Sequence, residues 1–308
     1  MFRKHTRRAA KAAFSISLGV ALLIGLVAAG GGAAGTTRPS AVTVTIGTKN
    51  FTEEFILGQL YKQALEAKGY KVDYKENIGS SELIDTAITS GKINFYPEYT
   101  GVIVLDLAKK SSPATAAATY TAAKSFEEGR NLTLLDRTPF FDSDSFGMLR
   151  STAHRLHVTT IAGMKKVKHF SYAGYPECKT RITCLLGLKN IYGLKQVKFV
   201  PLSSISVYTL LNQKKITAGD TFSTDPQLLS KKYIVLKDTK HIFGFQNVAP
   251  VLTKQLASDG GPAFATAVNA VSAKLTLPAM RAMNKAVAID KKTPADVADA
   301  FLKANGLK

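Results

Sequence analysis

The chain has 308 residues, 45% apolar and 20% charged, which is enough to build the cores of two ordinary domains and excludes general disorder. Its formal net charge is +19, of which five positive charges lie in the first 11 residues, and the rest is dispersed as single lysines and Lys-Lys pairs without a basic block interleaved with aromatic residues. This pattern indicates a cationic, solvated surface held near an anionic envelope, and argues against a nucleic-acid partner.

Residues 1–40 have the order of an export signal. Five basic residues precede the apolar run 14–29, and small residues follow it at 30–35. Arg7 and Arg8 also give the segment a twin-arginine look, so both the general and the twin-arginine export routes stay open. Cleavage is one reading, and a retained N-terminal anchor followed by a linker is the other, because the uncharged run 12–37 is long enough to span a membrane.

A first α/β series follows the linker. Strands are expected at 42–46, 71–75 and 93–96, because these runs are β-branched or apolar. Asn50 and Glu53 have the spacing of a capping box, which predicts a helix up to Gly69, and Ser80 or Ser81 begins a second helix that Gly91 ends. This order predicts a parallel sheet with right-handed crossovers, followed by an alanine-rich helix at 114–129.

The polar passage 137–144 marks a crossing into a second α/β series. Strands are expected at 146–149, 169–172, 197–201 and 216–220, and helices at 161–166, 185–192 and 206–213. The chain then returns near 244–251 and ends in helices that begin at Pro262, Pro278 and Pro294, since proline suits a first helical turn.

The two cysteines, Cys178 and Cys184, lie six residues apart. In an exported chain such a pair most often forms a disulfide, which would fix the turn that carries Glu177 and Arg181. A metal pair is the alternative, although no third or fourth ligand lies nearby in the sequence.

Signals of an enzyme are poor. The sequence has no G-x-S-x-G, P-loop or H-E-x-x-H motif, and the glycine pattern at 30–35 has no strand before it. His154 and His157 lack acidic or cysteine neighbours at metal-ligand spacing. We therefore expect a binding protein without catalytic residues, cofactor or metal, and an exported hydrolase or transferase on the same fold is the competing alternative.

Four motifs carry a resemblance. They are Ile46-Gly-Thr-Lys-Asn-Phe-Thr-Glu-Glu-Phe55, Tyr96-Pro-Glu-Tyr-Thr-Gly101, Tyr175-Pro-Glu-Cys-Lys-Thr-Arg181 with its continuation to Leu194, and Phe222-Ser-Thr-Asp225. In this order they resemble the substrate-binding proteins of glycine betaine/choline-type (quaternary amine) ABC importers, over residues 42 to the C-terminus. The first two motifs place polar residues just past the ends of strands, where open α/β sheets bind small molecules.

The resemblance implies a two-lobed, hinge-linked periplasmic-binding-protein fold of the type II kind, in which each lobe is a mostly parallel sheet flanked by helices. Lobe 1 would comprise residues 41–140 and 247–308, and lobe 2 residues 141–246. The protein would be an exported monomer on the outer face of the cytoplasmic membrane, which closes over an osmoprotectant and delivers it to an ABC permease. It would meet the membrane only through the permease or an uncleaved N-terminus.

The resemblance also carries ligand-binding roles onto individual positions. Lys49 and Arg181 would bind an anionic group, and Tyr99 and Phe222 would form an aromatic wall for a quaternary ammonium, which cannot donate a hydrogen bond. The full expected set is Lys49, Asn50, Ser80, Tyr99, Asp144, Glu177, Arg181, Phe222 and Gln246.

Several positions depart from the family's aromatic box. Phe222 lacks a tyrosine hydroxyl, Asp144 stands where a box tyrosine is common, Val102 replaces a hydroxyl residue, and Phe245-Gln246 replaces a further tyrosine. These departures leave a different cationic or zwitterionic amine, or an amino acid, as an alternative ligand. For each residue a purely structural role also stays open: a turn lysine, a core aromatic ring, a helix cap, or a Glu177–Arg181 surface pair.

Overall fold

The computed structural model describes residues 42–203 and 205–308, so the export signal expected in residues 1–40 lies outside the described part of the chain. Within these ranges, no helix has both the length and the apolar character needed to cross a membrane.

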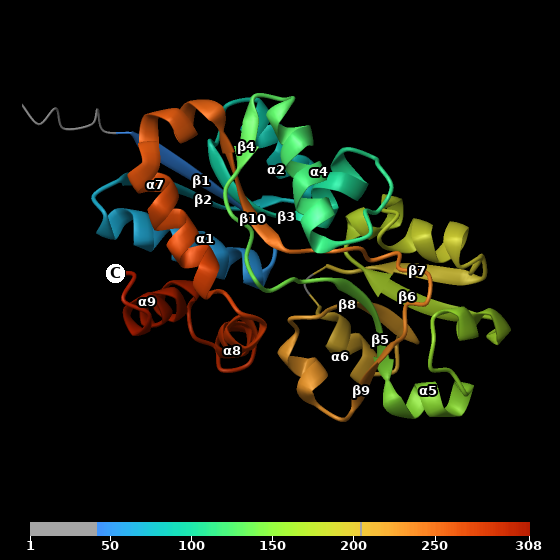
Figure 1. Cartoon of the computed structure of the whole chain (residues 1–308). Helices are drawn as coiled ribbons and strands as arrows, with labels where there is room; N and C mark the ends of the chain where they lie inside the picture. The colour runs from blue at the N-terminus through green and yellow to red at the C-terminus, as the bar shows by residue number, and fades with distance from the viewer. Residues whose placement is uncertain (1–41, 204) are drawn as a thin grey trace, which may run out of the picture. The chain divides into compact units, whose positions relative to one another are not determined.

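The first of two five-stranded sheets has the order β2-β1-β3-β10-β4 (Figure 1). Its strands are β1 Thr43–Lys49, β2 Lys71–Gly79, β3 Phe95–Tyr99, β4 Leu132–Leu134 and β10 Val248–Thr253. β1 pairs in parallel with β2 and β3, while β10 runs antiparallel to β3 and β4. The sheet is therefore mixed, because its fourth strand comes from the returning C-terminal part of the chain.

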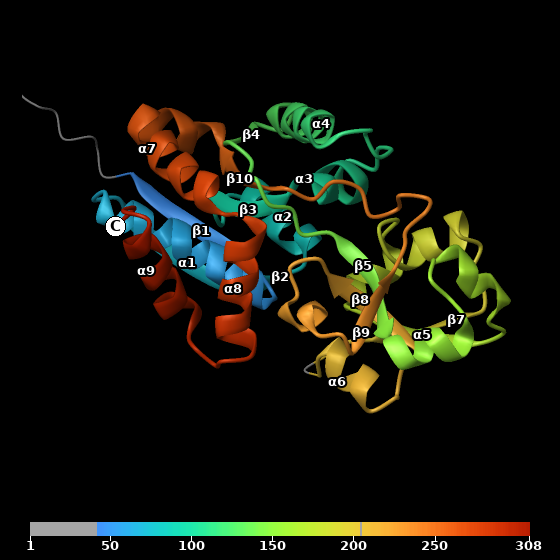
Figure 2. The ribbon, with the colours of Figure 1, turned by 60° about the horizontal axis from the view of Figure 1, so that its bottom comes forward.

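Helices cover both faces of this sheet. They are α1 Thr52–Ala67, α2 Ser81–Thr89, α3 Thr100–Val102 with the π turn η1 Ile103–Leu107, α4 Ala116–Glu128, α7 Lys254–Lys274, α8 Leu277–Ala288 and α9 Pro294–Ala304. The last three return to pack against α1 (Figure 2). One apolar core joins Ile46 of β1, Leu57 of α1 and Phe264 of α7, all without exposed surface.

The second sheet has the order β7-β6-β8-β5-β9. Its strands are β5 Asp144–Leu149, β6 Phe170–Gly174, β7 Val197–Pro201, β8 Ala218–Phe222 and β9 Tyr233–Leu236. It is also mixed, since β5 runs antiparallel to β8 and β9 whereas β6 pairs in parallel with β7 and β8. Around it lie α5 Arg150–Leu156, α6 Val207–Asn212 and the short segments η2 Ala162–Lys166, η3 Pro176–Thr180, η4 Gly187–Ile191 and η5 Pro226–Leu229.

Two crossing segments run side by side between the sheets. Phe141 and Asn247 form an antiparallel bridge. The Asn247 side-chain amide donates to the carbonyl oxygens of Thr138 (3.0 Å) and Phe140 (2.9 Å), and the Asp142 amide donates to Gln246 O at 3.0 Å. This pairing is suited to a hinge, because two adjacent extended segments can bend together without opening either core.

The two-sheet architecture is the one expected, but both sheets are mixed where mostly parallel sheets were expected, and two local details also differ. The capping box is wrong: Phe51 is the N-cap of α1, with no side-chain cap, and Glu53 makes buried contacts instead. The segments expected as helices at 161–166 and 185–192 are a 3-10 turn and a π turn. The helix expected from Pro262 is confirmed as the second segment of α7, which begins after the non-helical Gly261, where φ is 64°.

Several short elements were not expected: β4, α3 with η1, α5, η3, η5 and β9. Each has only a few residues, so its apolar pattern is too short to be recognised without its partner strands.

Candidate functional site

A cavity of about 50 Å³ lies where strand ends of the two sheets meet. Eight of the nine predicted ligand residues line it, which brings together positions from 49 to 246 of the chain. They are Lys49, Asn50, Tyr99, Asp144, Glu177, Arg181, Phe222 and Gln246. Ser80 does not line this cavity; its hydroxyl donates to Glu82 Oε2 at 2.6 Å, and the next residue, Ser81, lines it instead.

Lys49 lines the cavity, and its positive charge is paired with acidic side chains. β1 and β3 pair in parallel at Ile46 and Phe95, and Lys49 and Glu98 each lie three residues further along these strands. The ammonium is hydrogen-bonded to Glu98 Oε1 and lies 3.5 Å from Glu54 Oε1, and only 2% of Lys49 is exposed. Burial raises the pKa of Glu54 to about 8, with Lys49 opposing this shift. The lysine therefore already has two carboxylate partners from its own lobe.

Aromatic rings form one wall of the cavity. The Tyr99 ring lies 4.1 Å from the Lys49 ammonium, and its hydroxyl donates to Glu53 Oε1 at 2.9 Å. Phe51 stacks between Tyr99 and Phe222, with ring centroids 6.2 and 6.1 Å away. Phe51 belongs to the first lobe and Phe222 to the second. This stack is therefore part of the contact between the lobes that closes the cavity.

Three aspartates, Asp142, Asp144 and Asp220, form another wall. Asp144 pairs directly with Phe222 across β5 and β8, and Asp220 lies two residues before Phe222, so these three side chains share one face of the sheet. Burial raises the pKa of Asp144 to about 7, against the opposing effect of Arg181. It also raises the pKa values of Asp142 and Asp220 well above the usual range.

Arg181 joins the two lobes. It follows the turn η3 of the second lobe, and its guanidinium donates to both carboxylate oxygens of Glu82 in α2, at 3.3 and 3.2 Å. The surface pair with Glu177, which was the structural alternative for Arg181, is not formed, and Arg181 instead makes an ion pair between the lobes. Nearby, the Thr183 hydroxyl donates to Asp106 Oδ2 at 3.0 Å, which is a second contact between the lobes.

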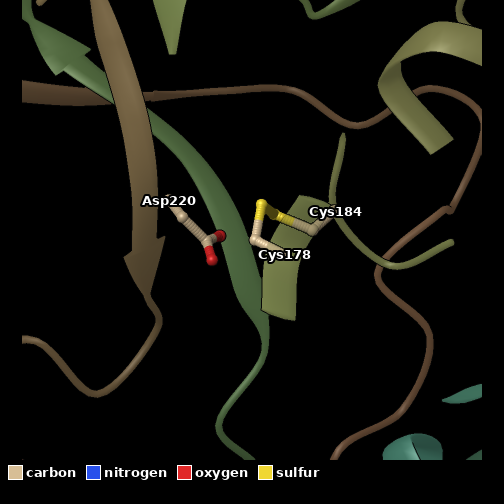
Figure 3. Close-up of side chains that lie close together, drawn as sticks. All are labelled: Cys178, Cys184 and Asp220. Atoms are coloured by element: carbon tan, nitrogen blue, oxygen red, sulfur yellow. A yellow bond between two sulfur atoms is a disulfide. The ribbon is translucent and has the colours of Figure 1, made fainter. Parts of the chain in front are cut away.

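The disulfide between Cys178 and Cys184 is confirmed, and it lines the cavity. Figure 3 shows the Asp220 carboxylate beside the two sulfur atoms. These three residues are close enough for a metal ion, but both sulfurs are bonded to each other and are not thiolate ligands. The disulfide instead anchors the turn between Glu177 and Arg181.

Gln246 closes the cavity beside α3. Its Oε1 accepts from the Val102 amide at 3.0 Å and its Nε2 donates to Phe243 O at 3.1 Å. The absence of a side chain at Gly101 makes this possible, since a Cβ there would lie 2.6 Å from the Gln246 amide. Gln246 thus supports the wall with its hydrogen bonds directed to the backbone.

Six further residues line the cavity although no ligand-binding role was predicted for them: Phe51, Ser81, Val102, Asp142, Tyr175 and Asp220. Phe51 and Tyr175 stand inside the motifs that carry the resemblance, and Val102 directly follows one of them, so motif position was an available signal. Asp220 had a weaker signal, at the end of an expected strand.

Residues 42–304 match the family model described as the substrate-binding domain of ABC-type glycine betaine transport systems. The chain belongs to this family. It is 31% identical, over 92% of its length and 93% of the relative's, to the glycine-betaine-binding protein of Pseudomonas aeruginosa. It is 25% identical to the carnitine transport binding protein OpuCC of Listeria monocytogenes, over 85% and 87% of the two chains.

Solved structures of this substrate-binding family have the same fold. A glycine betaine/carnitine/choline ABC transporter structure superposes with a TM-score of 0.68 at 24% identity, covering 86% of this chain and 99% of the other. A choline-binding protein in complex with choline gives 0.66 at 14% identity, covering 87% and 90%. The expected two-lobed binding-protein fold and solute-binding role are thereby confirmed. The family consists of solute-binding proteins, as expected for a chain without enzyme motifs.

Proposed function

We propose that the protein is an exported receptor that binds a cationic amine, of the quaternary choline-like type or closely related to it, and delivers it to an ABC permease. One observation carries this proposal. Both cations that line the cavity are already paired with carboxylates, Lys49 with Glu98 and Arg181 with Glu82, while three aspartates and a run of aromatic rings face the same space. A cationic ligand meets aromatic faces and acidic groups there.

The paired cations argue against a zwitterion as the preferred ligand. A betaine carboxylate needs free donors, but Lys49 and Arg181 would each have to give up an existing ion pair to supply them. It would also approach Asp144 and Asp220, and burying like charges close together is costly. We therefore expect choline to bind more tightly than glycine betaine.

The lobes are proposed to divide at 140/141 and 246/247. Every strand of the first sheet lies within 43–134 or 248–253, and every strand of the second within 144–236. Residues from both sides line the cavity, so a ligand that contacts both favours the closed arrangement through differential binding. Delivery to a permease, a monomeric state and a location outside the cytoplasmic membrane are part of the same proposal, and the family's solute-binding role supports the first and the last of them.

Isothermal titration calorimetry tests the ligand class. The panel is choline, glycine betaine, carnitine and 3,3-dimethyl-1-butanol, the neutral carbon analogue of choline. We expect choline to bind and the neutral analogue to bind at least tenfold more weakly because it lacks the charge. The affinity for betaine should be lower than that for choline, whether above or below that for the neutral analogue. Equal affinity for choline and its neutral analogue would refute the role of charge. A lack of heat with every amine would refute the proposed function.

A further inference from the structure

A second chamber of about 250 Å³ adjoins the first. Five residues line both: Phe51, Asp142, Tyr175, Asp220 and Phe222. The two spaces therefore share an aromatic and acidic wall, with the Tyr175 and Phe222 rings 6.5 Å apart. The second chamber extends from this wall toward η5 and α8, on the side away from Lys49 and Arg181, neither of which lines it.

The second chamber is acidic and lacks a cation. Its lining includes the carboxyl groups of Glu53, Asp142, Asp220 and Asp225, and no Lys, Arg or His among the described residues. Arg281, on the same helix α8 as the lining residue Asn284, does not line the chamber, and its guanidinium donates to Ser223 O at 3.0 and 2.7 Å. Buried carboxyl groups without a cationic partner are costly, so the chamber is suited to receive a positive charge.

Two neutral hydrogen-bond acceptors in the second chamber indicate which kind of ammonium group it suits. Asn284 is only 6% exposed and lines the chamber; its Nδ2 donates to Glu53 Oε2 at 2.7 Å, and its Oδ1 has no hydrogen-bond partner in the described structure. Gln227 Oε1, on the same lining, is also a buried acceptor without a partner there. A quaternary ammonium cannot satisfy these oxygens because it has no N–H, whereas a primary or secondary ammonium can.

We propose that the second chamber is a subsite for an N–H-bearing ammonium, so that the ligand is an extended amine with two separated positive charges. One cationic end lies against the rings and aspartates of the first chamber. The chain of the ligand passes along the shared wall of Phe51, Tyr175 and Phe222, and the second ammonium donates to Asn284, Gln227 and the nearby carboxylates. This inference rests on the proposed function as an amine receptor and names its substrate class.

Calorimetry with three probes separates the possibilities. The probes are choline, a linear diamine (1,4-diaminobutane and its longer homologues), and the fully N-methylated bis-quaternary compound of the same length. We expect the best diamine to bind roughly tenfold or more tightly than choline, as one additional charge-assisted contact provides. The bis-quaternary compound should lose most of this gain because it cannot donate a hydrogen bond.

Variants at Gln227 give a matched pair, because this residue lines only the second chamber and its side chain makes no other hydrogen bond in the described structure. Gln227→Glu should tighten diamine binding several-fold and Gln227→Leu should weaken it, with choline affinity unchanged in both. Thermal unfolding of each variant checks that it is folded.

The outcomes are distinguishable. Choline binding without any gain for a diamine would overturn the subsite and leave the proposed function in place. Equal affinity for the diamine and its bis-quaternary analogue would overturn the requirement for N–H. Parallel changes for choline and diamine in the Gln227 variants would also overturn the subsite, because the effect would then not be confined to the second chamber. Absence of binding by every amine would overturn the proposed function itself.

Discussion

Lys49 provides the sharpest test of how the cavity is charged. Its ammonium is hydrogen-bonded to Glu98 and lies 3.5 Å from Glu54, and both carboxylates have no exposed surface. Replacing Lys49 with methionine keeps the length of the side chain and removes its charge. The buried Glu98 carboxylate would then have no cation beside it, and the nearby Glu54 carboxyl group would lose the cation that favours its charged form, so the substitution should destabilise the folded protein.

The magnitude follows from the burial. Removing one partner of a buried ion pair costs about 3–5 kcal/mol, because the other charge stays desolvated. For a chain of this size each kcal/mol lowers the melting temperature by about 2–4 °C, so Lys49→Met should lower it by roughly 6–20 °C. Protonation of Glu54, whose pKa is already raised to about 8 by burial, relieves part of this cost, and the loss should therefore shrink as the pH falls.

Two controls isolate the effect in differential scanning calorimetry. The double variant Lys49→Met/Glu98→Gln removes one of the stranded charges and should recover at least half of the loss. Lys62→Met breaks the pair with Glu66 on the surface of α1 and should change stability by less than about 1 kcal/mol.

Binding measurements on the same variant complete the test. Removing the ammonium from the Tyr99 ring frees that ring and makes the cavity more acidic, so choline should bind at least as tightly to Lys49→Met as to the parent. The reasoning is refuted if Lys49→Met melts within about a degree of the parent and loses only betaine binding. Lys49 would then be a free cation that binds the ligand's carboxylate.

Four further predictions have defined outcomes. Tyr99→Ala should weaken choline binding by about 1–2 kcal/mol, and unchanged affinity in calorimetry would restrict this ring to a packing role. Cys178→Ser with Cys184→Ser should cost about 2 kcal/mol of stability, as expected for a short loop, and an unchanged denaturant midpoint would contradict this. The pKa of about 7 at Asp144 is raised above its unfolded value, so stability of the ligand-free protein should decrease as pH rises through 7, while affinity for choline should increase; opposite slopes would refute the assignment. Asp144→Tyr should raise betaine affinity relative to choline, and a variant that binds betaine no better than the parent would show that this carboxylate does not exclude it.

The elements and the location of the site were predictable because both depend on local patterns. The strand ends, the helix stops and the four motifs lie within short runs of sequence, and a parallel βαβ order brings the ends of consecutive strands to one edge. The mixed character of the sheets was less accessible. A return of the chain near 244–251 was expected, but no local signal shows that β10 is inserted between β3 and β4 after more than a hundred intervening residues.

The charge state of the site could not be predicted for a similar reason. Glu98 neutralises Lys49 from 49 residues away, and Glu82 pairs with Arg181 from 99 residues away across the two lobes. Nothing in the spacing of either motif shows that its cation already has a partner. The role of Glu53 also could not be predicted from local sequence. Its spacing from Asn50 indicated a capping box, but its buried contacts with Tyr99 and Asn284 depend on the tertiary fold.

Ligand choice within this family should therefore be considered from the ionic pairs as well as from the aromatic box. A lysine and an arginine at the motif positions favour a carboxylate-bearing ligand only where they are free. Here both are held by glutamates, and the groups left facing the cavity are aromatic rings and the three aspartates Asp142, Asp144 and Asp220. Replacing one ring position with Asp144 and pairing each cation act in the same direction, toward a positively charged ligand. The same box can thus select a different charge class of amine without any change in fold.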